Sequence, residues 1–346
     1  MASSGLARNA AVALGTLLLA EWGLGLYGLA VVPRAYEDEA WIASTSWKLA
    51  TQGVFGTDMQ GNAYGSATHY FGFMPLYPLL QAGMFRLAGL GLWQARFTSV
   101  LLGLVLCALT FALGRRLFGP QVALLAVAGL LLVRTAAQTA YRPTGILLVD
   151  LARLGRYDIA VPVLGLAACL ALGRAERRGR SWAALAGALG GLAGLAHVYG
   201  WFWLPALAAA VVHVGGRRGA GRWAAAAVGA LLLGAGLVLL PYLLYVLLNG
   251  RDWLGQVSIY RDRLALLDLA WYARNLLTEP QRLGPGFSAD WRSWLRPGLG
   301  LAVFGGGTAA VARGFPTWKS GLATLPELLV GRRSQVFRCL WGLPEW

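Results

Sequence analysis

Three consecutive carboxylates, Glu37, Asp38 and Glu39, are the residues of this sequence best suited to acid–base chemistry. They stand out because only 15 of the 346 residues are Asp or Glu. A carboxylate in such a group can take a proton from a hydroxyl or help to hold a cation. The alternative is a solvated acidic loop that orients the preceding helix. An apolar run at 10–32 directly before the triplet favours the functional interpretation, because it places the carboxylates at a membrane surface.

A second set of charged residues, Arg153, Arg156 and Asp158, comes just before a strongly apolar run over 159–172. Isolated acids at the border of such runs are costly and usually functional. The two arginines could grip a phosphate in the bidentate way that a guanidinium favours. They could equally pair with Asp158 and lock two helices together. The residues alone leave both interpretations open.

Three further polar groups lie in apolar surroundings. The segment from His69 to Tyr77 offers an imidazole and phenols that could bind a substrate, although such residues are also frequent at membrane interfaces for packing reasons. His197, two residues before Tyr199, is interpreted as a helix-packing histidine. Glu21, near the middle of the first apolar run, must be neutralised or paired inside the bundle, and its role stays open.

The composition indicates an integral membrane protein. Hydrophobic residues make up 57% of the chain and charged residues 13%, whereas a soluble domain usually carries about 25% charged residues. The net charge of +15 does not form a basic stripe with interleaved aromatics, so no nucleic-acid partner is expected. The arginines gather instead in short clusters at 115–116, 174–180 and 217–222. We therefore predict an all-α fold, a polytopic transmembrane helical bundle.

Seven apolar segments are candidate membrane spans. They lie at about 10–32, 97–114, 121–134, 157–173, 182–198, 200–214 and 223–248. With the N-terminus in the cytoplasm, the arginine clusters follow the second, fourth and sixth spans and are all cytoplasmic, as the positive-inside rule expects. The segments that carry the candidate chemical groups then face outward.

The first outer segment, 33–96, is too long to be a simple connector. Its periodic stretches at 40–51 and 76–90 predict helices that lie along the membrane surface. We expect residues 1–248 to form one transmembrane catalytic domain that includes this outer loop. Residues 249–346 are expected to form an outer C-terminal segment that is incomplete or poorly defined.

Several short motifs follow one another in a fixed order along 10–248. They are Asp38-Glu39-Ala40-Trp41, Phe73-Met74-Pro75-Leu76-Tyr77, Trp93-Gln94-Ala95-Arg96-Phe97, Leu113-Gly114-Arg115-Arg116-Leu117-Phe118-Gly119 and Arg156-Tyr157-Asp158. This order resembles that of the GT-C glycosyltransferases that use polyprenyl-phosphate sugars, namely the protein O-mannosyltransferases and the lipid A aminoarabinose transferases. The resemblance implies a GT-C-like helical membrane fold in the cell (inner) membrane, with its active site facing outward.

The resemblance also implies an inverting transfer of a hexose or pentose. It identifies Asp38 with the catalytic aspartate of an acidic pair, Glu39 with its neighbour and Asp158 with a second acidic position. The predicted site therefore has two catalytic carboxylates, Asp38 and Asp158, and five substrate-binding residues: Glu39, His69, Tyr77, Arg153 and Arg156. No cofactor is predicted with certainty; a divalent metal ion held between carboxylates is conceivable, but its ligands are unknown.

The expected partners are a polyprenyl-phosphate sugar donor, an acceptor that is a protein, a lipid or a glycan, and membrane lipids. Because sugar nucleotides are made in the cytoplasm, a donor delivered by the membrane suits an outward-facing enzyme. Two alternatives stay open. A transporter or lipid-handling protein would carry ionisable residues deep inside its spans. A truncated, non-catalytic relative would be unaffected by replacement of Asp38.

Overall fold

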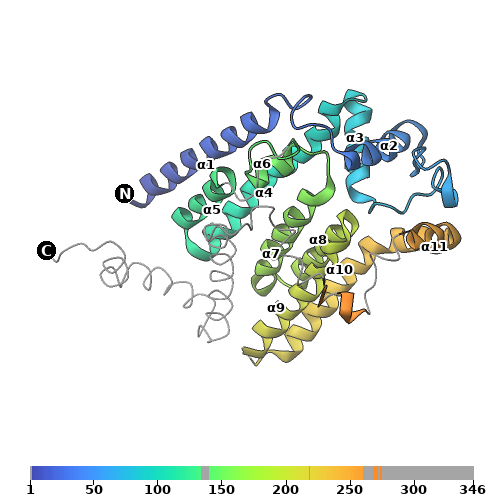
Figure 1. Ribbon diagram of the computed structural model, residues 1–346. Coiled ribbons are helices and arrows are strands. Elements are labelled where there is room, and N and C mark those ends of the chain that lie inside the picture. Colours follow the sequence, from blue (N-terminus) through green and yellow to red (C-terminus); the bar gives the residue numbers. More distant parts are fainter. Residues whose placement is uncertain (1, 134–139, 218, 260–267, 272, 275–346) are drawn as a thin grey trace.

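The computed structural model describes residues 2–133, 140–217, 219–259, 268–271 and 273–274. Every regular element in these ranges is a helix, which confirms the predicted all-α fold (Figure 1). The helices are α1 (Ala2–Leu26), α2 (Glu37–Gln52), η1 (Ala63–Gly65), α3 (Leu76–Ala88), α4 (Leu92–Phe118), α5 (Pro120–Leu132), α6 (Leu147–Ala152), η2 (Tyr157–Ile159), α7 (Ala160–Arg178), α8 (Arg180–Ala196), η3 (Val198–Phe202), α9 (Trp203–Arg217), α10 (Gly221–Leu248) and α11 (Gly250–Ser258). Beyond α11 most of the predicted C-terminal segment lies outside the described residues.

Each of the seven predicted spans corresponds to a helix, and within the described residues five helices are long and apolar enough to cross a membrane. The five are Arg8–Leu26, Leu92–Phe118, Tyr157–Ala175, Val198–Gly216 and Gly221–Leu248. The other two, α5 and α8, have 13 and 17 residues, which makes them about 20 and 26 Å long against a hydrocarbon core of about 30 Å. The protein is therefore a multi-pass membrane protein.

The arginine clusters gather at one end of the bundle. Arg116, at the end of α4, donates hydrogen bonds to the carbonyls of Leu170 (3.4 Å) and Gly173 in α7. The last turn of α7 carries Arg177 and Arg178. Asp158 comes just before the first turn of α7, and 19 residues of helix separate the two ends by about 28 Å. We call the end that carries Asp158 the site end.

Helix α8 lies inside the bundle and packs most extensively against α10 and α7. The backbones of α8 and α10 touch because small residues line the crossing, as is common between membrane helices. A Cβ atom on Gly187 would lie 1.8 Å from the carbonyl oxygen of Leu231, and one on Gly234 would lie 1.9 Å from that of Ala184. Only glycine fits at these two positions. This rigid pair supports the segments that follow α8 and α10 at the site end.

Two helix boundaries differ from the prediction. Helix α1 ends at Leu26 rather than near Val32, because Gly28 turns the chain with a φ of +59°. Helix α2 begins at Glu37 rather than at Ala40, so the acidic triplet forms its first turn. Carboxylates are favoured there because the N-terminus of a helix carries partial positive charge. The two helices predicted in the first outer segment are present as α2 and α3.

Candidate active site

The acidic triplet divides between two environments, and Glu39 takes the buried one. Its carboxylate accepts two hydrogen bonds from the guanidinium of Arg96, at 2.7 and 2.9 Å. It also accepts one from the backbone N–H of Tyr36 and one from that of Gly155, each at 2.8 Å. Arg96 donates in addition to the carbonyl of Leu29 at 2.9 Å. Because four donors occupy the two oxygens, Glu39 joins α2, α4 and the residue before Arg156 into one unit.

Asp38 points to the opposite side and meets the second charged set. Arg156 lies between two carboxylates: its Nη2 is 3.2 Å from Asp38 Oδ2 and its Nε is 2.9 Å from Asp158 Oδ2. The second contact is an ion pair by distance, without the alignment of a hydrogen bond. The side chains of Asp38 and Asp158 are 34% and 35% exposed, so both can be reached by a ligand.

The guanidinium of Arg156 stays charged in this setting. Burial works to lower its pKa, but the nearby Asp158, Tyr157 and Asp38 together raise the pKa above its ordinary value. Arg156 also lies over the rings of Tyr36 and Tyr157, at 5.1 and 5.6 Å from their centroids. Such cation–π contacts stabilise the position of the guanidinium. The site thus offers one cation and two carboxylates within contact distance.

His197 supports this cluster from the end of α8. Its ring stacks on that of Tyr157 with the centroids 4.7 Å apart. Its Nδ1 accepts a hydrogen bond from the backbone N–H of Tyr199 at 3.2 Å. These contacts agree with the interpretation of His197 as a packing histidine, and they add that it packs beside the charged cluster.

Tyr77 lies beneath the site and is completely buried. Its hydroxyl shares a hydrogen bond of 2.6 Å with Ser99, and the Ser99 hydroxyl donates to the carbonyl of Arg156 at 3.2 Å. Burial raises the pKa of Tyr77 well above its usual range, so the phenol stays protonated. From this position Tyr77 supports the backbone of Arg156 and does not face the two exposed carboxylates.

Arg153 is also buried, with 5% of its surface exposed. Its Nη2 donates to the carbonyls of Tyr27 and, at 2.7 Å, of Val32, both just beyond the end of α1. Burial lowers the pKa of Arg153 and nearby Arg96 lowers it further, while Asp150 and Glu21 act in the opposite direction. Arg153 therefore fastens α1 to the loop that carries Arg156.

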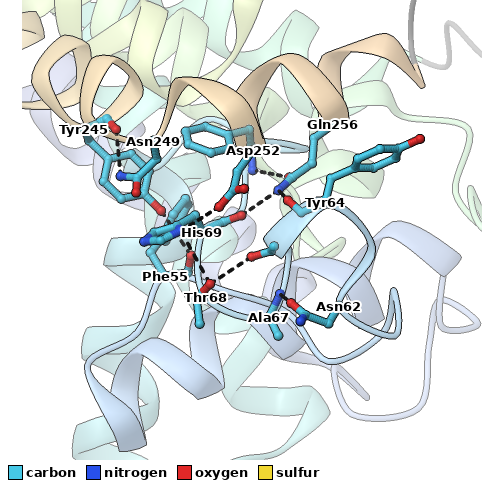
Figure 2. Close-up of polar contacts among 12 residues, drawn as sticks. Phe55, Asn62, Tyr64, Ala67, Thr68, His69, Tyr245, Asn249, Asp252 and Gln256 are labelled. Carbon is cyan, nitrogen blue, oxygen red and sulfur yellow. Dashed lines mark hydrogen bonds and ion pairs between the residues drawn. The ribbon is translucent and has the colours of Figure 1, made fainter.

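His69 belongs to a separate group of contacts, between the outer loop (53–72) and α11 (Figure 2). Its Nδ1 lies 2.9 Å from Asp252 Oδ2 in α11. Gln256 fixes the same loop by accepting from the N–H of Phe71 at 2.8 Å and donating to the carbonyls of Tyr64 (3.0 Å) and His69 (2.6 Å). His69 thus contacts α11 rather than the Asp38–Arg156–Asp158 group, and its predicted binding role stays a prediction.

The geometry of the acids bears on the conceivable divalent metal. Within the described ranges, no group of three or more His, Cys, Asp and Glu side chains is arranged to hold a metal ion. The carboxylates of the triplet do not converge on one point, because Glu39 pairs with Arg96 while Asp38 pairs with Arg156. The metal ligands therefore stay unknown.

Sequence reasoning missed the structural partners of the site. Arg96, Ser99 and Gly155 were not among its predicted residues, although Arg96 occurs in one of the motifs that carried the resemblance. The available signal was a charged residue at the start of an otherwise apolar helix, which needs a buried partner. Its identity could not be read from the sequence, because Glu39 is 57 residues away.

The chain matches the dolichyl-phosphate-mannose-protein mannosyltransferase family over residues 74–235. The matched family is of the GT-C glycosyltransferase type, so the predicted resemblance is confirmed. No curated protein and no solved structure matches the chain. The mannosyltransferase-family segment includes Arg156 and Asp158 but begins after Asp38. It supports a membrane glycosyltransferase of the mannosyltransferase type, in a family that uses polyprenyl-phosphate sugar donors.

Proposed function

We propose that the protein transfers a sugar from a polyprenyl-phosphate donor to a hydroxyl group of an acceptor, at the site end of the bundle. The observation that carries the proposal is the position of Arg156, a charged guanidinium between two exposed carboxylates. This gives a cation for the donor phosphate beside a base for the acceptor. The family match to the segment that holds Arg156 and Asp158 supports the same reaction.

Asp38 is the general base of the proposed reaction. It takes the proton of the acceptor hydroxyl while the hydroxyl oxygen attacks the anomeric carbon of the sugar. The bond between that carbon and the phosphate oxygen breaks, and the polyprenyl phosphate leaves with the electron pair. One displacement of this kind inverts the anomeric configuration. The transferred group is a hexose or a pentose.

Arg156 links donor binding to the activation of Asp38. In the structure its single positive charge is shared by two carboxylates. An incoming phosphate competes for the guanidinium, because Arg binds phosphate with charge-assisted hydrogen bonds. Once Arg156 turns to the phosphate, the carboxylate of Asp38 is released to face the acceptor hydroxyl. Arg156 then stabilises the negative charge that develops on the leaving phosphate, while Asp158 keeps Arg156 or the acceptor in place.

Three of the predicted substrate-binding residues take a supporting role in this proposal. Glu39, Tyr77 and Arg153 are all buried, and their polar atoms hold α1, α4 and the loop before Arg156. We assign them to positioning rather than to substrate contact. His69 is retained as a residue of the acceptor side, since its side chain is 35% exposed beside the outer loop.

The proposed orientation places the site end on the periplasmic or lumenal side of the cell (inner) membrane. The arginine clusters lie at the opposite end of the bundle, and an excess of arginine is typical of cytoplasmic loops. An outward-facing site has no access to cytoplasmic sugar nucleotides, so a donor carried by the membrane is required. The acceptor is a protein, a lipid or a glycan.

The test is sugar transfer by the purified protein in liposomes that contain a polyprenyl-phosphate hexose. Loss of a general base predicts that Asp38→Asn lowers the rate by about 10²–10⁴-fold. Asp58→Asn is the matched control, because Asp58 is an aspartate of the same outer segment whose side chain is 72% exposed and pairs with Lys48. Equal rates for the parent and Asp38→Asn would remove Asp38 from its role. No transfer by the parent protein would refute the proposed activity.

A further inference from the structure

Glu21 is a fully buried carboxyl group in membrane helix α1, five residues before its end at Leu26, and the reaction proposed above does not use it. It lies where α1, α4 and α6 meet. A Cβ atom on Gly103 would be 2.5 Å from Glu21 Oε1 and 3.0 Å from the side chain of Ala152. Glycine at position 103 therefore makes room for the carboxyl group, which lies against the residue before Arg153.

Two buried polar groups at this junction lack hydrogen-bond partners within the described part of the chain. One is the carboxyl group of Glu21, with both of its oxygens, and the other is the Nε of Arg153. The same two side chains interact electrostatically. A buried group without a partner is costly, and native proteins rarely keep one without a reason. An acceptor and a donor that both lack partners therefore occur at the same junction of helices.

The buried charges near Glu21 indicate its protonation state. Three acids, Glu21, Glu39 and Asp150, are fully or almost fully buried with two arginines, Arg96 and Arg153. Glu39 is neutralised by Arg96, and Asp150 accepts three hydrogen bonds from the Thr144–Gly145 turn. If all five residues were ionised, one negative charge would stay uncompensated in a low dielectric, which is strongly unfavourable. A neutral Glu21 balances the group.

The contacts of Arg153 connect this junction to the site. Its Nη2 holds the carbonyls of Tyr27 and Val32 beyond α1. Two residues later, the N–H of Gly155 is held by Glu39 at 2.8 Å. The next residue is Arg156, which bridges Asp38 and Asp158. Any group that fixes Arg153 therefore also fixes where the guanidinium of Arg156 enters the site.

We propose that Glu21, as a neutral carboxylic acid, is the partner of Arg153 and thereby positions the loop 153–156 for the reaction. The hydrogen bond from Arg153 Nε reaches the carboxyl group of Glu21 through one ordered water. Glu21 is a positioning residue and does not touch the substrate. The kinetic part of the inference rests on the proposed function, whereas the position of the loop can be measured without it.

The test compares Glu21→Gln, which keeps a neutral hydrogen-bonding group of the same size, with Glu21→Leu, which removes it. Two quantities are measured on the full-length protein: hydrogen–deuterium exchange of the peptide that contains 153–156, and the kinetics of transfer from a polyprenyl-phosphate hexose. We expect Glu21→Gln to match the parent in both. We expect Glu21→Leu to speed exchange and to raise KM for the donor by about tenfold or more, with a smaller change in kcat, as loss of a hydrogen bond to a charged group predicts.

Unchanged exchange in Glu21→Leu would overturn the proposal, and so would a Glu21→Gln variant as impaired as Glu21→Leu, since that would require an ionised carboxylate. If Glu21→Leu does not fold, Gly103→Ala displaces the carboxyl group without removing it and should speed exchange of the same peptide. Unchanged exchange in a folded Gly103→Ala variant would also overturn the proposal. Absence of transfer by the parent protein would refute the enzymatic function, while the exchange data would still decide the role of Glu21.

Discussion

The buried ion pair of Glu39 and Arg96 gives a quantitative prediction about stability. Both side chains are at most 2% exposed, and the carboxylate accepts four hydrogen bonds that join α2, α4 and the 153–156 loop. Removing one partner of such a pair leaves the other charge buried without compensation. This typically costs about 3–5 kcal/mol. We therefore expect Glu39→Leu and Arg96→Met each to lower the free energy of unfolding by about that amount.

The double variant should recover much of this loss. A buried pair replaced by apolar residues of similar volume is often close to neutral in stability. Part of the loss should remain, because the N–H groups of Tyr36 and Gly155 also lose their acceptor, at about 1–3 kcal/mol for each buried group. The double variant should therefore be more stable than the sum of the two single effects predicts, by several kcal/mol, or about 10²-fold or more in the unfolding equilibrium.

The assay is reversible unfolding in mixed detergent micelles, followed by tryptophan fluorescence. Lys48 and Asp58 provide the control pair, because Asp58 is 72% exposed and an exposed pair contributes only about 0–1 kcal/mol. A single Glu39→Leu or Arg96→Met effect as small as that of Asp58→Asn would refute the reasoning. So would additive effects in the double variant. Either result would mean that the two charges do not depend on each other.

Two further predictions concern the helices and the loop that support the site. Gly234→Ala places a Cβ atom 1.9 Å from the carbonyl oxygen of Ala184, so α8 and α10 must separate at a cost of about 1–3 kcal/mol. Thermal unfolding measures this loss of stability, and Gly236→Ala is the control because nothing lies within 4 Å of its new Cβ atom. Gln256→Ala removes three hydrogen bonds that hold the outer loop and leaves buried groups unpaired, at about 1–3 kcal/mol. Hydrogen exchange in the outer loop should rise, whereas the exposed Gln52→Ala should leave it unchanged.

The fold could be predicted well from the sequence because each membrane helix is recognisable from its own apolar composition. A long apolar segment satisfies its own backbone hydrogen bonds, so each of the seven spans was located without knowledge of its neighbours. The predicted helix ends were less accurate where a glycine turn or the helix dipole, rather than hydropathy, decides where a helix begins or ends. The apolar run reaches Val32, but Gly28 ends α1 earlier. The acids of the triplet are polar, yet the helix dipole draws them into the first turn of α2.

The candidate site was predicted only in part, because its charged residues pair with residues that are far away in the sequence. The topology placed Asp38, Arg156 and Asp158 on the same side of the membrane and the resemblance grouped them in one site. In the structure Arg156 contacts both aspartates. Glu39 was expected to bind substrate beside Asp38. Its engagement by Arg96 depends on how α2 crosses α4, which no local pattern encodes. The same limit applies to Glu21, whose neighbour Arg153 lies more than one hundred residues away in the sequence.

Helix geometry explains why the adjacent acids Asp38 and Glu39 contact different partners. Successive residues of an α-helix point about 100° apart, so Asp38 and Glu39 in the first turn of α2 cannot face the same partner. Glu39 faces inward and fastens the helix to Arg96 and Gly155, and this fixes the direction in which Asp38 points. Exchanging the two residues would keep the charge and the composition, but the aspartate side chain at position 39 is one methylene shorter and would draw its carboxylate away from Arg96 and Gly155. An acidic pair at a helix start can therefore supply one carboxylate for chemistry and one for position, and neither can replace the other.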